Sequence, residues 1–84
     1  MLPGINSRVV RLLFALLDAA EDDGLFRNFA GEARWRELKL LAATQRFETE
    51  VSPFFSLLAE LERAGRLEHT WMLERWHKVK AQWD

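Results

Sequence analysis

Two histidines and two groups of carboxylates are the residues of this 84-residue chain whose types and spacing could do chemistry. His69 and His77 are eight residues apart, but no third ligand is evident beside them, so we expect no metal site. The carboxylates at Asp22–Asp23 and Glu48–Glu50 lie in polar stretches, where nothing would separate their pKa values as acid–base catalysis requires. The chain also has no glycine-rich phosphate loop and no nucleophile elbow. We therefore expect a binding protein, without catalytic residues and without a cofactor.

A second group of residues could contact a nucleic acid or a protein. Trp71 and Trp76 lie among Arg75, Lys78 and Lys80, and such interleaved side chains can stack on bases and contact phosphates. Alternatively, Trp71 and Trp83 close a small core and the lysines are solvated. Trp76 breaks the alternation of polar and apolar residues in this segment, so we expect it to be exposed. An exposed tryptophan is a common anchor at protein interfaces.

The composition indicates one small globular domain over residues 1–84. Hydrophobic residues make up 49% of the chain, and four Trp and six Phe can supply the core of a short chain. Cysteine is absent, which excludes disulfides and favours a reducing cytoplasm. The net charge of −1 counts against strong nucleic-acid binding but allows a local basic patch. No stretch approaches the roughly 20 apolar residues of a membrane span.

Apolar residues at spacings of three and four predict three helices. They run from about Ser7 to Asp23, from about Glu32 to Gln45 and from Ser52 to Ala64. A glycine follows the first and the third helix, where a left-handed residue can end each of them. Leu25–Ala30 is short and partly alternating, and is either a connector or a short strand.

The C-terminal segment fits two structures. From Leu67 onward, apolar residues fall mostly at odd positions, which is the period of a half-buried β-hairpin with its turn near Leu73–Trp76. However, Met72, Trp76 and Val79 have helical spacing, and the turn lacks Gly, Asn and Pro. We expect a mostly helical α+β fold in which three helices precede a C-terminal β-hairpin, with an all-α four-helix fold as the alternative.

This order of elements, together with one local motif, resembles a winged helix-turn-helix domain. Leu61–Glu68 reads Leu-Glu-Arg-Ala-Gly-Arg-Leu-Glu, and resembles the junction between recognition helix and wing in small bacterial and phage repressors. The resemblance covers mainly residues 50–72. The third helix is about one turn longer than the usual pattern, and the expected wing tip has no glycine. Glu60 and Glu62 lie where phosphate repulsion would weaken DNA binding.

The resemblance implies a small transcriptional regulator that binds double-stranded DNA. The helix over residues 52–64 would enter the major groove, with Ser56 and Arg63 facing the bases. Phosphates would be contacted from the C-terminal wing by Arg66, Arg75, Lys78 and Lys80. Such domains usually bind as dimers, so the resemblance also implies a possible homodimer, with a contact from the first helix or from Trp76.

A protein-interaction module with the same fold is the competing hypothesis. Small winged helices serve as adaptors, or as phage-type inhibitors of host protein complexes. Glu60 and Glu62 on the third helix, the acidic end of the first helix and Trp76 would then form the protein interface.

Overall fold

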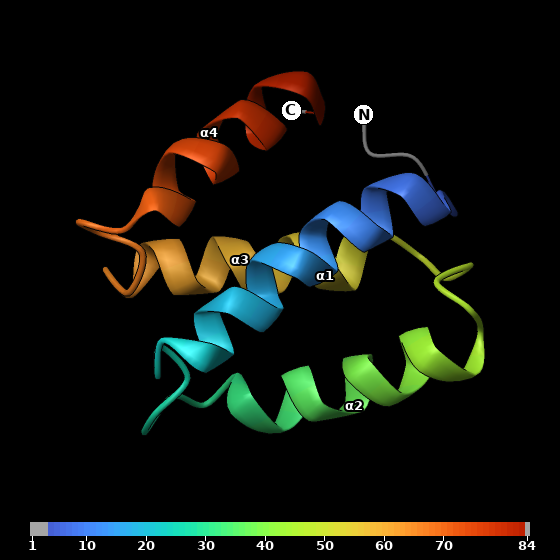
Figure 1. Ribbon diagram of the computed structural model, residues 1–84, viewed down its shortest axis with the longest axis horizontal. Coiled ribbons are helices and arrows are strands. Elements are labelled where there is room, and N and C mark those ends of the chain that lie inside the picture. Colours follow the sequence, from blue (N-terminus) through green and yellow to red (C-terminus); the bar gives the residue numbers. More distant parts are fainter. Residues whose placement is uncertain (1–3, 84) are drawn as a thin grey trace.

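Four helices make up the fold, and the computed structural model describes residues 4–83 (Figure 1). The helices are α1 (Ser7–Asp22), α2 (Glu32–Thr44), α3 (Ser52–Arg63) and α4 (Trp71–Trp83). α1 crosses in front of α3, while α4 lies on one side of α1 and α2 on the other (Figure 1). The bounds predicted for the first three helices agree with the structure to within one residue.

The prediction of a C-terminal β-hairpin is wrong, and with it the winged-helix architecture. Residues 71–83 form α4, and no strand occurs between residues 4 and 83. Met72, Trp76 and Val79 are buried together, which is the arrangement that their helical spacing allows. The segment has no residue suited to a tight turn, so an unbroken helix satisfies its backbone better than a hairpin would. The all-α alternative is correct, and the short strand considered at Leu25–Ala30 is a series of turns.

Local signals explain where α1 begins and where α1 and α3 end. The Asn6 side chain accepts hydrogen bonds from the backbone N–H groups of Arg8 and Val9, at 3.1 and 3.3 Å. Gly24 and Gly65 follow the ends of α1 and α3 with φ of 76° and 74°, the left-handed conformation that glycine adopts without strain.

A single hydrophobic core lies between the helices. Apolar side chains at helical spacing on α1, α2 and α3 are buried in it. They comprise Val9, Leu13, Leu16 and Ala20 of α1, Trp35, Leu38 and Ala42 of α2, and Phe54, Leu57, Leu58 and Leu61 of α3. Leu67, Met72 and Trp76 extend this core under α4.

Trp35 connects α2 to the rest of the core through aromatic contacts. Its ring is stacked on Phe26 at 6.0 Å between centroids and lies 5.1 Å from Phe14 of α1. The Trp35 Nε1 atom is buried and has no hydrogen-bond partner in the described part of the chain. Aromatic packing therefore holds α2 in place at the expense of one unsatisfied donor.

Candidate functional site

The residues expected to bind nucleic acid do not form one basic surface. Ser56 and Arg63 are exposed on α3, and Arg75 and Lys78 are exposed on α4. Lys78 lies 3.9 Å from Glu74, one turn earlier on the same helix. Arg66 and Lys80 are engaged within the protein, as described below.

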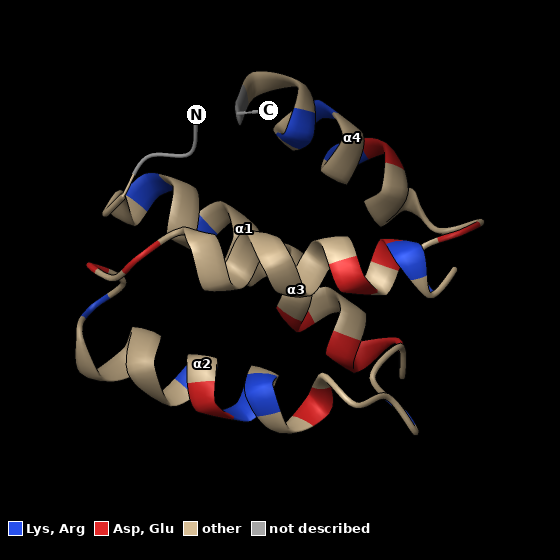
Figure 2. Ribbon diagram, turned by 180° about the vertical axis from the view of Figure 1, so that it is seen from behind, with Lys and Arg blue, Asp and Glu red and all other residues tan. Residues whose placement is uncertain are grey.

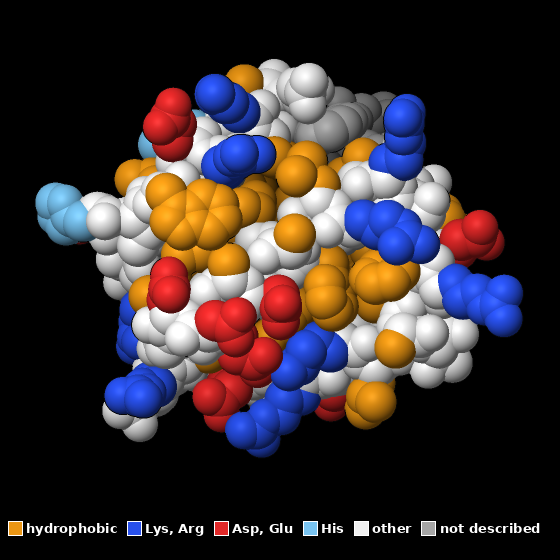
Figure 3. Space-filling view, viewed as in Figure 1, with side chains coloured by type: hydrophobic (Ala, Val, Ile, Leu, Met, Phe, Trp, Pro, Cys, Tyr) orange, Lys and Arg blue, Asp and Glu red, His pale blue; other side chains and the backbone are white. Residues whose placement is uncertain are grey.

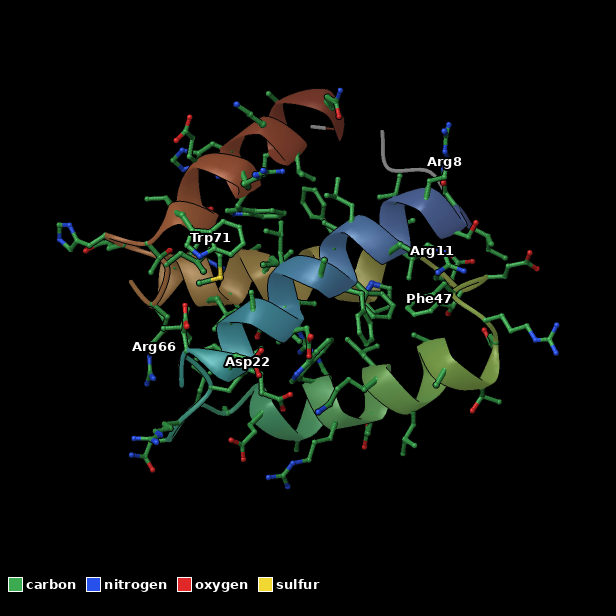
Figure 4. All side chains as sticks on the ribbon, viewed as in Figure 1. Arg8, Arg11, Asp22, Phe47, Arg66 and Trp71 are labelled. Atoms are coloured by element: carbon green, nitrogen blue, oxygen red, sulfur yellow. The ribbon has the colours of Figure 1, made fainter. Side chains whose placement is uncertain are left out.

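Arg66 fastens the loop between α1 and α2 to the end of α3. Its guanidinium donates hydrogen bonds to the backbone carbonyls of Leu25, at 3.3 Å, and Arg27, at 2.8 Å. It also lies 5.4 Å from the centre of the Phe29 ring. Figure 4 labels Arg66 at this corner of the molecule. Because its guanidinium binds two carbonyls and an aromatic ring, Arg66 stabilises the fold and is not free to contact phosphates in this conformation.

Glu62 is the centre of a charged cluster that joins α3 to α4. Its carboxylate accepts hydrogen bonds from Lys80 Nζ at 2.7 Å and Trp76 Nε1 at 2.8 Å, and it lies 3.1 Å from His77 Nε2. The hydrogen bond from Lys80, opposed by partial burial and assisted by the other two partners, lowers the pKa of Glu62 to about 2. Lys80 and Glu62 therefore neutralise each other inside the protein.

The expectation that Trp76 is exposed is wrong. The side chain is fully buried, and its ring lies 4.7 Å from that of Phe55. The expectation relied on the alternation of polar and apolar residues in a strand, and this segment is a helix, in which that alternation has no meaning. Trp71, which was expected to close the core together with Trp83, is 58% exposed instead. The side chain of Trp83 lies outside the described part of the structure.

Glu60 is also engaged within the protein, through an ion pair with Arg34 of α2. Figure 2 shows the acidic residues in the C-terminal half of α3. The acidic side of α3, expected to meet a protein, is therefore partly neutralised by α2 and α4.

The histidines and carboxylates that could do chemistry are either exposed or paired with other side chains. His69 is exposed, and His77 is engaged with Glu62. Among residues 4–83, no three side chains of the ligating types lie close enough together to hold a metal ion. Glu21, the nearest acid to Asp22–Asp23, is paired with Lys39 at 2.9 Å.

The outward stripe of α1 is a surface of which sequence reasoning named only the acidic end and a possible dimer contact. We call it the α1 face. Its members are Arg8, Arg11, Leu12, Ala15, Asp18 and Asp22, which are exposed, and Ala19, which is half-buried. At 3.6 residues per turn these positions form one stripe of about 120°, opposite the buried side of the helix. The amphipathic pattern of α1 is visible in the sequence, so the stripe could have been found there.

Trp71 lies beside the α1 face and extends its apolar part. Figure 4 shows this side chain beside the C-terminal half of α1, and Figure 3 shows apolar surface in the middle of the same side of the molecule. Leu12, 36% exposed, borders a groove of about 430 Å³ whose other wall is α4, including Arg75 and Val79. Apolar side chains are therefore accessible from both helices on this side.

The charges of the α1 face have no ion-pair partners in residues 4–83, unlike those of Glu60 and Glu62. The two arginines lie at the start of α1, where the helix dipole favours acids, and its acids lie at the end, where the dipole favours bases (Figures 2 and 4). The Arg11 guanidinium lies over the Phe47 ring, 4.4 Å from its centre, and Arg11 remains exposed. The charge order of α1 therefore does not stabilise the isolated helix.

Comparisons with protein-family models, with curated proteins and with solved structures found no match for this chain. In the described residues, no helix combines the length and the apolar character that crossing a bilayer requires.

Proposed function

We propose that this chain is a protein-interaction module that binds a protein partner through the α1 face and Trp71. The observation that carries the proposal is the combination, on one side of the fold, of exposed apolar side chains and charges that have no ion-pair partner in residues 4–83. Trp71 is 58% exposed, and large exposed aromatics are typical anchors of protein interfaces. The polar rim that such an anchor requires is supplied by the charges at the two ends of α1.

Binding to DNA has less support from the contacts. Phosphate binding needs several free cations on one surface, yet Arg66 donates to carbonyls and Lys80 to a carboxylate. The net charge of −1 adds no general attraction to a polyanion. With random duplex DNA at about 50 mM salt, we therefore expect no binding at micromolar concentrations.

A photo-crosslinking amino acid at position 12 tests the proposal directly. Leu12 lies at the edge of the α1 face, so a crosslinker there should form adducts with a bound protein in cells that express the chain. The matched control places the same crosslinker at Leu40 of α2, which is 71% exposed and lies outside the face. Trp71→Ala should reduce the adducts from position 12, because it removes the anchor.

The outcome against the proposal is equally clear. Equal protein adducts from positions 12 and 40, no protein adduct from either, or adducts to nucleic acid alone from position 12 would each contradict it. Trp71→Ala should leave the far-UV circular dichroism unchanged, since most of this side chain is in solvent.

A further inference from the structure

The charges of the α1 face are arranged symmetrically about its middle residue. Ala15 lies seven residues after Arg8 and seven before Asp22, and Arg11 and Asp18 lie inside that interval. Basic residues occupy one end and acidic residues the other, as Figure 2 shows along α1. The charges of such a stripe are complementary to those of a second, antiparallel copy of the same stripe.

Resting on the proposed function, we propose that the partner bound by the α1 face is a second copy of this chain, with the two α1 helices antiparallel about Ala15. Such a contact has a two-fold axis, so each residue meets the same partner in both directions. In this register, residue 8 of one copy lies opposite residue 22 of the other. Residue 11 lies opposite the level of residues 18 and 19.

The helical geometry brings opposite charges together on both sides of the axis. Arg11 and Asp18 lie on the same edge of the stripe, and Arg8 and Asp22 lie near its centre line. An antiparallel two-fold contact keeps each edge facing the same edge of the second copy. It therefore forms Arg11–Asp18 and Arg8–Asp22 ion pairs between the copies, each of them twice.

The apolar residues fit the same register. Leu12 lies on the other edge of the stripe, at the level where it meets Ala19 of the second copy. Ala15 meets Ala15 at the axis, and its small side chain lets the two helices approach closely. Figure 3 shows the open side of the molecule on which this contact would form, across its broad face.

The inverted charges of α1 favour a second copy over an unrelated protein. Like charges lie three or four residues apart on the stripe, at Arg8–Arg11 and at Asp18–Asp22, which is unfavourable in an isolated helix. An antiparallel copy places acids beside the basic end and bases beside the acidic end, so it relieves both repulsions at once. An unrelated partner would need a matching charge order of its own.

Reciprocal charge reversal tests the inference. One variant carries Arg8→Asp and Arg11→Asp, and the other carries Asp18→Arg and Asp22→Arg. A homodimer of either variant would contain four like-charge contacts. A heterodimer of the two variants would contain all four ion pairs. Both variants also place charges favourably for the helix dipole, which offsets the loss of the Arg11–Phe47 contact in the first variant, so both should fold. Thermal unfolding confirms that point before association is measured.

The measurement is sedimentation velocity at about 10–200 µM and low salt. We expect the wild type to dimerise with a dissociation constant on the order of 10–100 µM, as for interfaces at the small end of the size range. Each variant alone should be monomeric, with dimerisation weakened on the order of 100-fold or more. An equimolar mixture should form a one-to-one heterodimer that high salt dissociates.

Matched controls reverse equally exposed charges outside the face. Arg36→Asp with Arg63→Asp, and Glu37→Arg with Glu48→Arg, give the same changes in net charge. These variants should dimerise as the wild type does.

Three results would overturn the inference: a monomeric wild type, dimers that survive both reversals, or a mixture that stays monomeric while the wild type dimerises. The proposed function fails separately, in the crosslinking experiment. Adducts of twice the chain mass from position 12 agree with both proposals. Adducts only to another protein would keep the proposed function and overturn self-association.

Discussion

Replacing Glu62 with glutamine tests how α4 is held against α3. The glutamine keeps the size of the side chain and an oxygen that can accept from Trp76 Nε1, but Lys80 loses its carboxylate. The pKa of Glu62 falls from 4.5 to about 2 in the folded protein. At about 1.4 kcal/mol per pKa unit, the upper bound on the stabilisation is about 3.5 kcal/mol.

Solvent reduces this value, because about a quarter of the Glu62 side chain (26%) is exposed. We expect Glu62→Gln to lower the free energy of unfolding by about 1–2 kcal/mol at pH 7. The pKa is lower in the folded state than in the unfolded chain, so the stabilisation is present above about pH 4.5 and is lost as the pH falls towards 2. The difference between variant and wild type should shrink over that interval.

Urea unfolding followed by tryptophan fluorescence at pH 7, 4 and 2.5 measures both effects. The control is Glu74→Gln, whose side chain is 81% exposed and lies 3.9 Å from Lys78, and it should cost less than about 0.5 kcal/mol. A loss below about 0.5 kcal/mol for Glu62→Gln, or a loss that does not change with pH, would refute the role given to this cluster.

Three further predictions concern the packing of the fold. Gly31→Ala should destabilise the protein by about 1–3 kcal/mol in urea unfolding, because a Cβ there would lie 2.7 Å from a ring carbon of Phe29 and 2.8 Å from Leu57 Cδ1; no loss would contradict this packing. Arg66→Ala should speed amide hydrogen exchange in residues 24–31, because the loop loses two hydrogen bonds to its carbonyls. Arg66→Lys should not restore the protection, because a lysine cannot bind both carbonyls and lie over the Phe29 ring. Unchanged exchange in Arg66→Ala would contradict this role of Arg66. Leu61→Ala should lower the free energy of unfolding by about 2–5 kcal/mol, since the leucine is fully buried, and a smaller loss would show that the site collapses around the cavity.

The first three helices were predictable because their signals are local. The apolar residues of α1 and α3 repeat at helical spacing, and the glycines that follow both helices adopt the left-handed conformation expected of them. These signals depend on neighbouring residues alone, so they hold whatever the rest of the chain does.

The form of the C-terminal segment was decided by tertiary packing. Its apolar residues fit both a strand period and a helical period, so spacing alone could not choose between them. The core left open by α1 and α3 accepts Met72, Trp76 and Val79 from one side of a helix. Burying that side turned Trp71 outward and Trp76 inward, which reversed the roles expected for the two tryptophans.

The properties of the binding surface also come partly from the sequence and partly from the tertiary structure. The sequence by itself determined which charges the chain carries and that α1 has a polar side. Only the tertiary structure decided which charges are neutralised, because an ion pair such as Glu62–Lys80 joins residues on different helices. Packing gave partners to Glu60, Glu62 and Arg66 and left the ends of the α1 face without any in residues 4–83, since α1 presents that side to solvent.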